Sequence, residues 1–347
     1  MSFDPNSAAT GDSGIYGLPY DYKQSTLIYL PVPWEVTTSY GGGTSKGPAA
    51  IFEASHQVDL FDYDVLRPYE PGLFWLKESK EVARWNREAK KKAQGIIEVG
   101  GDIEGKPKLK KDLADVNKAS EKLNDFVYRE TAKIFKDGKI PAVVGGDHSV
   151  PFGAIQAAGD VSNEFGVLHF DAHSDTRDAY EGFQWSHASI MRNVLDRIPQ
   201  VKKLVQVGIR DFCEEEVEYC DGQKERVKVF YDGYLCKRKY EGDPWKKLVE
   251  EIVANLPKEI WVSFDIDGLD PILCPHTGTP VAGGLSFQEA NFVLNTLVKS
   301  GRKIIGFDLN EVSPGKDEWD ANVGARFLYK MTGWTLASQG KAKPRNP

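Results

Sequence analysis

Histidine and aspartate side chains gather in three short segments of this chain, each directly after an apolar run. The segments are GGDHS at residues 145–149, DAHSD at residues 171–175 and DIDGLDP at residues 265–271. Imidazole and carboxylate groups bind divalent metal ions and transfer protons. The apolar runs predict buried strands, and α/β proteins bind their ligands at the carboxyl ends of such strands. The three segments therefore predict one shared functional site.

The spacing within the second and third segments aims several carboxylates toward one place. In an extended chain, residues i, i+2 and i+4 point to one side, so Asp171, His173 and Asp175 are expected to converge. Asp265 and Asp267 are expected to share a face in the same way. Without a cation, buried carboxylates would repel one another and be poorly solvated. The alternatives are a solvated polar loop for DAHSD and a structural histidine at the strand end for GGDHS.

Six side chains make up the candidate metal ligands: His148, Asp171, His173, Asp175, Asp265 and Asp267. This set is too large for one tetrahedral zinc ion and fits two adjacent divalent ions bridged by carboxylates. Oxygen-rich ligation with one imidazole per ion favours Mn²⁺. Ni²⁺, Co²⁺ and Fe²⁺ are compatible, because ligand type does not fix the metal. An EF-hand calcium loop fits poorly, since the flanking segments read as strands and the ligand spacing differs.

Seven short apolar runs alternate with helical patterns, and this alternation predicts an α/β fold with a mostly parallel sheet. The predicted strands span residues 26–31, 140–144, 166–170, 203–207, 227–231, 260–264 and 303–307. Apolar residues at the helical period predict a helix over Val116–Phe135. Ser286 and Glu289 form a capping-box start for a helix that Gly301 ends. Residues 74–112 are charged and less periodic, which predicts a helix-and-loop insertion on the surface.

Bulk properties are those of an ordinary globular protein. The 347 residues carry a net charge of −7 without a basic stripe, so nucleic acid is not an expected partner. No linker or repeat divides the chain, so we expect an N-terminal arm over residues 1–24 and a single domain over residues 25–347. Neither a signal peptide nor a membrane span is expected. Four cysteines without a Cys-x-x-Cys pair predict free thiols and a cytoplasmic location.

GGDHS, DAHSD and SFDIDGLDP, in this order, resemble the three metal motifs of the ureohydrolase family, which includes arginase, agmatinase and guanidinase. The resemblance extends over roughly residues 25–330 and includes HTGTP at residues 276–280. It implies a three-layer α/β/α domain with a mostly parallel, eight-stranded sheet, and it implies homotrimers or homohexamers. The implied activity is hydrolysis of a guanidino C–N bond with release of urea, which would make residues 25–347 the catalytic domain.

The resemblance also assigns roles to individual residues. One ion would be held by His148, Asp171, Asp175 and Asp265. The other would be held by Asp171, His173, Asp265 and Asp267. Asp171 and Asp265 would thus bridge the two ions, and Asp175 would also hold the nucleophile and pass on its proton.

Two further residues match catalytic positions of the family. His187, in WSHAS, corresponds to the proton-transferring histidine, and an imidazole can titrate near neutral pH. Glu311, in NEVSP, corresponds to the carboxylate that binds the guanidinium. A surface histidine and a helix-capping glutamate are the alternatives.

The segment after Asp175 bears on the substrate. It lacks the Asn-containing stretch that arginases carry there, which argues against arginase, and it looks more like agmatinase-type sequences. Glu181 or Asp178 would receive the distal ammonium of agmatine, whereas Arg177 would favour a guanidino acid.

Free guanidine is the second candidate substrate, because a small pocket walled by aromatic residues would hold it through cation–π contacts. Trp34, Trp185 and Trp319 are available for such contacts, and the segment around Trp319 would close the site. We place agmatine first, guanidine second, and guanidino acids or arginine last.

Two other functional classes make different predictions. A zinc deacetylase shares this general fold, but it would need one metal, fewer aspartates and a tyrosine near the site. A non-catalytic, metal-binding regulatory protein would be expected to have lost a ligand, and none of the six is missing.

Overall fold

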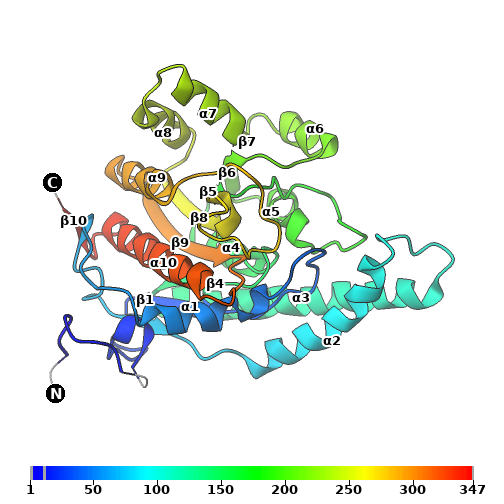
Figure 1. Ribbon diagram of the computed structural model, residues 1–347, viewed down its shortest axis with the longest axis horizontal. Coiled ribbons are helices and arrows are strands. Elements are labelled where there is room, and N and C mark those ends of the chain that lie inside the picture. Colours follow the sequence, from blue (N-terminus) through cyan, green and yellow to red (C-terminus); the bar gives the residue numbers. More distant parts are fainter. Residues whose placement is uncertain (1–2, 11–12, 346–347) are drawn as a thin grey trace.

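Eight strands form the central sheet in a computed structural model, which describes residues 3–10 and 13–345 (Figure 1). They are β1 (Leu27–Pro31), β3 (Leu73–Trp75), β4 (Ile140–Val144), β5 (Phe165–Phe170), β6 (Val201–Ile209), β7 (Val227–Tyr231), β8 (Glu259–Asp265) and β9 (Lys303–Asn310). Their spatial order is β3-β1-β4-β9-β8-β5-β6-β7, and all neighbouring pairs are parallel. The expected eight-stranded parallel sheet is confirmed. A separate antiparallel pair joins β2 (Val65–Leu66) to β10 (Lys343–Pro344).

The central strands are apolar on both faces because helices cover both sides of the sheet. Every residue of β4 and β5 is buried. One face carries α1 (Gly47–Ser55), α8 (Trp245–Ala254), α9 (Phe287–Lys299) and α10 (Trp319–Ser338). The other face carries α3 (Pro107–Lys136), α4 (Phe152–Val161) and α5 (Ile190–Arg197). Each face has its own hydrophobic cluster, with Phe264 and Phe327 in one and Trp261 and Ile155 in the other.

Several local sequence signals form the helix caps and strands that were predicted from them. Ser286 caps α9, and its capping box with Glu289 is present. All seven predicted strands exist, with ends that differ by a few residues. The eighth strand, β3, has only three residues and was not predicted.

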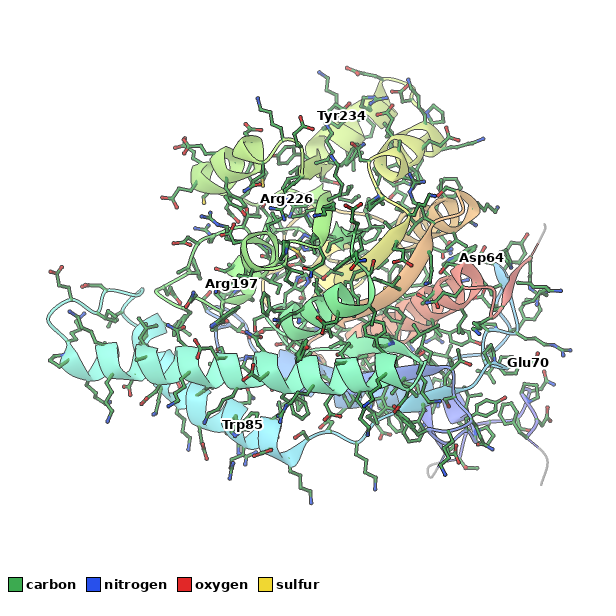
Figure 2. All side chains as sticks on the ribbon, turned by 180° about the vertical axis from the view of Figure 1, so that it is seen from behind. Asp64, Glu70, Trp85, Arg197, Arg226 and Tyr234 are labelled. Carbon is green, nitrogen blue, oxygen red and sulfur yellow. The ribbon has the colours of Figure 1, made fainter. Side chains whose placement is uncertain are left out.

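Residues 74–112 are more regular than the predicted insertion. They include the end of the edge strand β3, all of α2 (Lys80–Ile97) and the first turns of α3, which begins at Pro107 and not at Val116. Figure 2 shows α3 running along the back of the molecule, with Trp85 of α2 beside it. The remaining helices, α6 (Glu214–Gly222) and α7 (Asp232–Tyr240), flank β7.

Part of the predicted N-terminal arm packs against the body. Ile15, Tyr16 and Leu18 are buried, and the Tyr16 hydroxyl donates a hydrogen bond to the Ala325 carbonyl oxygen of α10 at 3.1 Å. The division at residue 24 remains a prediction. Within the described residues, no helix combines the length and the apolar character that crossing a bilayer requires.

The contact between α3 and α4 gives a stability prediction. A Cβ atom at Gly153 would lie 2.2 Å from the Asn124 carbonyl oxygen and 2.7 Å from the Tyr128 nitrogen, both backbone atoms of α3. Gly153→Ala should therefore lower the free energy of unfolding by about 2 kcal/mol or more. Gly95→Ala on α2 is the matched control, because a Cβ there would meet only a Leu109 methyl group at 3.5 Å. The control should be neutral or stabilise by about 0.5–1 kcal/mol, as helix propensity dictates.

Urea denaturation followed by circular dichroism measures both variants. Equal stabilities of the two variants would contradict the close packing of α4 on α3.

Candidate active site

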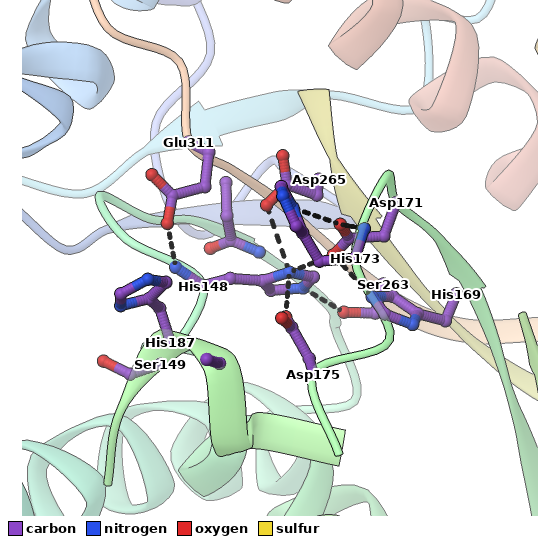
Figure 3. Close-up of polar contacts among 12 residues, drawn as sticks. His148, Ser149, His169, Asp171, His173, Asp175, His187, Ser263, Asp265 and Glu311 are labelled. Atoms are coloured by element: carbon purple, nitrogen blue, oxygen red, sulfur yellow. Dashed lines mark hydrogen bonds and ion pairs between the residues drawn. The ribbon is translucent and has the colours of Figure 1, made fainter. Parts of the chain in front are cut away.

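The strand order brings the three polar segments to one edge of the sheet. β4 and β5 follow one another along the chain, but β9 and β8 lie between them in the sheet. The order in which strands are added to the sheet therefore changes direction at this point. Ligands of α/β proteins bind at such a switch point, beyond the carboxyl ends of the strands. All six predicted metal ligands lie there (Figure 3 shows most of them), and they form two groups that share Asp171.

The first group surrounds His148. Its Nδ1 atom lies 3.0 Å from an Asp171 carboxylate oxygen and 3.3 Å from carboxylate oxygens of both Asp175 and Asp265. All four side chains are buried. One nitrogen thus faces three carboxylates from the ends of two other strands (Figure 3).

The second group surrounds His173. Its Nδ1 atom lies 3.1 Å from Asp267 Oδ2 and 3.4 Å from Asp171 Oδ1. Asp171 therefore presents one oxygen to each histidine. This is the arrangement that a bridging carboxylate needs.

The backbone that aims these carboxylates is extended only in part: Asp265 is extended, whereas Asp175 is not. Asp175 has a positive φ of 55°, so the chain turns back at this residue. Asp265 ends β8 and caps the short helix η4 (Ile266–Gly268), where its Oδ1 accepts the Asp267 N–H at 2.8 Å. The predicted residues converge, but turns bring them together where the sequence pattern suggested strand alternation.

Hydrogen bonds behind the site determine which ring nitrogen of His148 faces the carboxylates. The Ser263 hydroxyl donates to Asp308 Oδ1 at 2.8 Å, so it must accept from His148 Nε2, 2.9 Å away. The Nδ1 atom of His148 therefore faces the carboxylates. Burial disfavours a charged ring, but hydrogen bonds to Asp171, Asp175 and Asp265 raise the pKa of His148 well above its usual value, and a metal ion would take the place of the Nδ1 proton. Outer partners of this kind orient histidines that bind metal ions.

His169 was not predicted and lies directly against the ligand groups. Its Nε2 is 2.8 Å from Asp171 Oδ2, while its Nδ1 accepts from Gln206 Nε2 at 3.0 Å. Because Nδ1 is the acceptor, Nε2 donates its proton to Asp171, and His169 is a partner of a ligand and not a ligand itself. The signal was present in the sequence, since His169 precedes Asp171 by two residues on a strand and so points the same way.

Among the described residues, histidines are the only possible cations that face the carboxylates of the site. Asp171, Asp175, Asp265 and Asp267 are each less than 5% exposed, and no lysine or arginine of the described residues forms an ion pair with them. Burial, together with the charge of Asp171, raises the pKa of Asp175 to about 7. Burial and the neighbouring carboxylates also raise the pKa of Asp265 well above its usual value. Burial opposes ionisation of Asp171 as well, but the surrounding histidines hold its pKa well below the usual range.

His187 lies beside this cluster and is neutral at pH 7. Its Nδ1 is 3.3 Å from the Thr37 hydroxyl, and the same hydroxyl oxygen accepts the His187 backbone N–H at 3.2 Å. That hydroxyl can therefore donate to Nδ1, which leaves the ring proton on Nε2. Burial, assisted by positive charge on His173 and His148, lowers the pKa of His187 to about 4. The sequence-based expectation of titration near neutral pH does not describe this environment.

Glu311 lies on the same side of His148 as His187 (Figure 3). Its Oε1 accepts the backbone N–H of His148 at 2.8 Å, whereas its buried Oε2 has no hydrogen-bond partner in the part of the chain that the structure describes. Burial, and then the charge of Asp147, raises the pKa of Glu311 well above its usual value. The residue has a positive φ of 62°, an unfavourable conformation for a glutamate that is often found at functional sites.

A cavity of about 150 Å³ opens onto His173, Asp175 and His187. Its wall also includes Ser39, Arg177, Tyr180, Asp211, Phe212, Glu216 and Thr279. The Arg177 guanidinium lies 5.0 Å from the centre of the Tyr180 ring, and its Nε is 3.7 Å from Glu216 Oε2.

The other predicted substrate contacts lie elsewhere. Glu181, Trp319 and Glu311 are not part of the cavity wall, although the Glu311 carboxylate lies behind it, beside His148. The Trp319 indole N–H donates to the Ile272 carbonyl oxygen at 3.0 Å, at the start of α10. Trp34 is buried in the core, and Trp185 packs on Phe152, so none of the three tryptophans proposed for a guanidine cage lines this cavity.

Comparison with known proteins identifies the family of this chain. The sequence profile of the arginase family matches residues 25–333. The chain belongs to the arginase family. Members of this family are hydrolases that act on C–N bonds of amidines at a dinuclear metal site, and the buried His/Asp cluster fits such a site.

Among arginase-family proteins, this chain is closer to agmatinase-type members than to true arginases. It is 31% identical to the N(1)-aminopropylagmatine ureohydrolase of Thermococcus kodakarensis, with 90% of this chain and 91% of that protein covered. It is 28% identical to an agmatinase of Bacillus anthracis, with coverage of 96% and 99%. The agmatine ureohydrolase structure from Thermoplasma volcanium matches with a TM-score of 0.71 at 22% identity, covering 96% of this chain and 97% of that one. The arginase from Medicago truncatula gives 0.65 at 20% identity, with coverage of 92% and 88%.

The neutral state of His187 gives a prediction on pH and stability. The folded-state pKa of about 4 lies below the value near 6.5 that an unfolded histidine has. As the pH falls from 7 to 5, only the unfolded chain gains this proton, so His187 should cost the folded protein about 2 kcal/mol over that range. His187→Asn removes this contribution.

The measurement is the free energy of unfolding in urea at pH 7 and at pH 5, for the wild type and for His187→Asn at the same metal concentration. The variant should lose about 2 kcal/mol less than the wild type on acidification. Equal losses would mean that His187 is not held in the neutral form.

Proposed function

We propose that this arginase-family protein hydrolyses the guanidino C–N bond of a small guanidino compound and releases urea, with agmatine as the preferred substrate. The observation that carries the proposal is the unpartnered Oε2 atom of Glu311, a buried carboxylate oxygen next to the His/Asp cluster. A guanidinium group presents paired N–H donors that match a carboxylate. Its binding would satisfy this oxygen and supply the positive charge that Glu311 lacks.

The ligands proposed for the two ions follow the two groups around the histidines. His148, Asp171, Asp175 and Asp265 would hold one divalent ion. Asp171, His173, Asp265 and Asp267 would hold the other. The His148 Nδ1 atom that faces three carboxylates, and the absence of a lysine or arginine partner for these carboxylates among the described residues, support this assignment. We propose Mn²⁺ as the metal, with Ni²⁺ as the alternative, because oxygen-rich sites with one imidazole per ion accept both. When bound, two such ions lower the pKa of a water molecule between them toward neutrality.

The remaining steps fall to the side chains of this chain. Glu311 would orient the guanidinium so that its carbon faces the cluster. Asp175, whose carboxylate lies 3.3 Å from His148 Nδ1 and lines the cavity, is placed to accept a proton from the attacking water. A neutral imidazole is too weak an acid to protonate an amine. His187 would therefore first take up the proton of the attacking water through Asp175, its neighbour in the cavity wall, and then give that proton to the leaving amine.

Agmatine is favoured by the carboxylates of the cavity wall and by the relatives. Arg177 is accompanied by Glu216, whereas among the described residues the one ion-pair partner of Asp211 is His173, whose Nε2 lies 3.9 Å from Oδ2. Asp211 would therefore receive the distal ammonium of agmatine, in place of Glu181 or the exposed Asp178. Relatives named agmatinase and N(1)-aminopropylagmatine ureohydrolase support a guanidino substrate with a second cationic group.

Free guanidine is the second candidate, and the size of the cavity favours it. About 150 Å³ resembles the volume of engineered protein cavities that bind benzene, a six-atom ring. The four heavy atoms of guanidine fit such a space entirely, whereas the chain of agmatine would extend into the mouth. A cytoplasmic location and assembly as a homotrimer or homohexamer remain predictions.

The test is urea release from a substrate panel by enzyme loaded separately with Mn²⁺ and Ni²⁺. The panel contains agmatine, N(1)-aminopropylagmatine, guanidine, arginine, guanidinobutyrate and formimidoylglutamate, the last followed as formamide. Agmatine should dominate with kcat/KM above roughly 10³–10⁴ M⁻¹s⁻¹. His187→Ala should lose at least about 10²-fold, as removal of a general acid does.

Two aspartate variants separate the candidate substrates. Asp211→Asn should lower kcat/KM for agmatine about tenfold and leave any turnover of guanidine unchanged, because only agmatine carries the distal cation. Asp178→Asn, at an aspartate that is 90% exposed and outside the cavity, is the matched control and should change neither. Absence of urea from every compound, with two ions bound per chain, would overturn the proposed function.

A further inference from the structure

We propose that His276 is a positioning residue that fixes the Glu311 carboxylate for substrate binding, acting through the loop of residues 270–285. The role of Glu311 itself rests on the function proposed above. His276 lies outside the cavity, and its side chain is 47% exposed. It joins the loop to the start of α10 and to the segment that follows Glu311.

The first link is a two-point attachment to Asp320. The His276 ring contacts Asp320 Oδ2 through Nδ1 at 2.8 Å, and the His276 backbone N–H donates to Asp320 Oδ1 at 2.9 Å. Asp320 is fully buried in the first turn of α10, where a helix N-terminus stabilises a carboxylate. His276 is thus held on both oxygens of a fixed group.

The second link runs from the loop to Glu311. Thr277, the residue after His276, is buried, and its hydroxyl donates to the Glu311 carbonyl oxygen at 2.8 Å. A Cβ atom at Gly278 would lie 3.4 Å from Glu311 Oε2, so the loop backbone forms the wall beside the unpartnered oxygen. Thr279, one residue further, lines the cavity.

Glu311 needs this external support because its own backbone conformation is unfavourable. A φ of 62° is a left-handed conformation that favours glycine, and a glutamate keeps it only where neighbours hold it. One hold is the hydrogen bond from the Glu311 N–H to the Gly146 carbonyl oxygen at 2.7 Å. The Thr277 hydroxyl provides the second hold on the backbone, and the His148 N–H holds the side chain at Oε1. Release of His276 would free the second hold while leaving the first intact.

The packing of the ring favours a tether over a separate metal site. A Cβ atom at Gly315 would lie 2.4 Å from the His276 ring, so the ring rests on the backbone four residues after Glu311. His276, Asp317 and Asp320 are close enough to share a cation. Both Asp320 oxygens, however, already bond to His276 itself.

The experiment compares His276→Ala with His276→Asn. Asparagine can place an amide N–H near the position of Nδ1 and so restore the bond to Asp320. His276→Ala should raise KM for the preferred guanidino substrate about tenfold, with kcat changed less than about threefold, because misplacement of an orienting group weakens binding. Both variants should retain two bound Mn²⁺ ions per chain. His276→Asn should recover most of the loss.

A double-mutant cycle tests the route through Thr277. Thr277→Val removes the hydroxyl that bonds to Glu311. If His276 acts through Thr277, the double variant His276→Ala/Thr277→Val should lose little more kcat/KM than the single variant with the larger loss. If the fold losses in kcat/KM of the two single variants multiply in the double variant, His276 acts by another route and the inference is overturned.

Hydrogen–deuterium exchange provides a readout that does not depend on the reaction. Amides of residues 309–314 should exchange faster in His276→Ala than in the wild type, and His276→Asn should restore the wild-type rate. If the wild type hydrolyses no guanidino compound, the proposed function fails, but this exchange still decides the role of His276. Unchanged exchange, loss of folding or of the two Mn²⁺ ions in His276→Ala, or a third ion lost from that variant, would each overturn the inference.

Discussion

Mutual repulsion among four buried carboxylates is the constraint on which the rest of this structure depends. Asp171, Asp175, Asp265 and Asp267 meet at the edge of the sheet without a lysine or arginine partner within residues 3–10 and 13–345. Charges this close in a buried site are strongly unfavourable unless a cation compensates them. The dinuclear metal site of the arginase family provides that compensation, which explains why a protein would place these groups together.

The sheet and its buried polar residues hold the carboxylates against this repulsion. β9 and β8 separate β4 from β5, so ligand segments that follow strands far apart in the sequence meet at one edge. Behind the ligands, Ser263 and Asp308 on neighbouring strands fix the ring of His148. Asp175 and Glu311, whose backbone conformations are unfavourable, lie at the same edge. Strain is tolerated where a rigid sheet surrounds it, and here it aims side chains that a strand could not direct.

The sequence predicted the parts of this arrangement that depend on local pattern. Continuous apolar runs gave seven of the eight strands, and the three polar segments identified the ligand groups, because burial and strand ends leave clear marks in a sequence. What it missed depends on tertiary contacts. β3 is too short to show a period, and the turn at Asp175 has no signal in DAHSD. The neutral state of His187 follows from burial beside positive charge. The cavity wall likewise includes Asp211 and not Glu181, which only the folded loops decide.

The most direct test of the account is an anomalous-scattering map of crystals grown with Mn²⁺. The account predicts two peaks per chain, with Asp171 and Asp265 between them, His148 beside one and His173 beside the other. A single peak, or peaks only away from these residues, would mean that the four carboxylates are not compensated by two ions, and the central claim would be wrong.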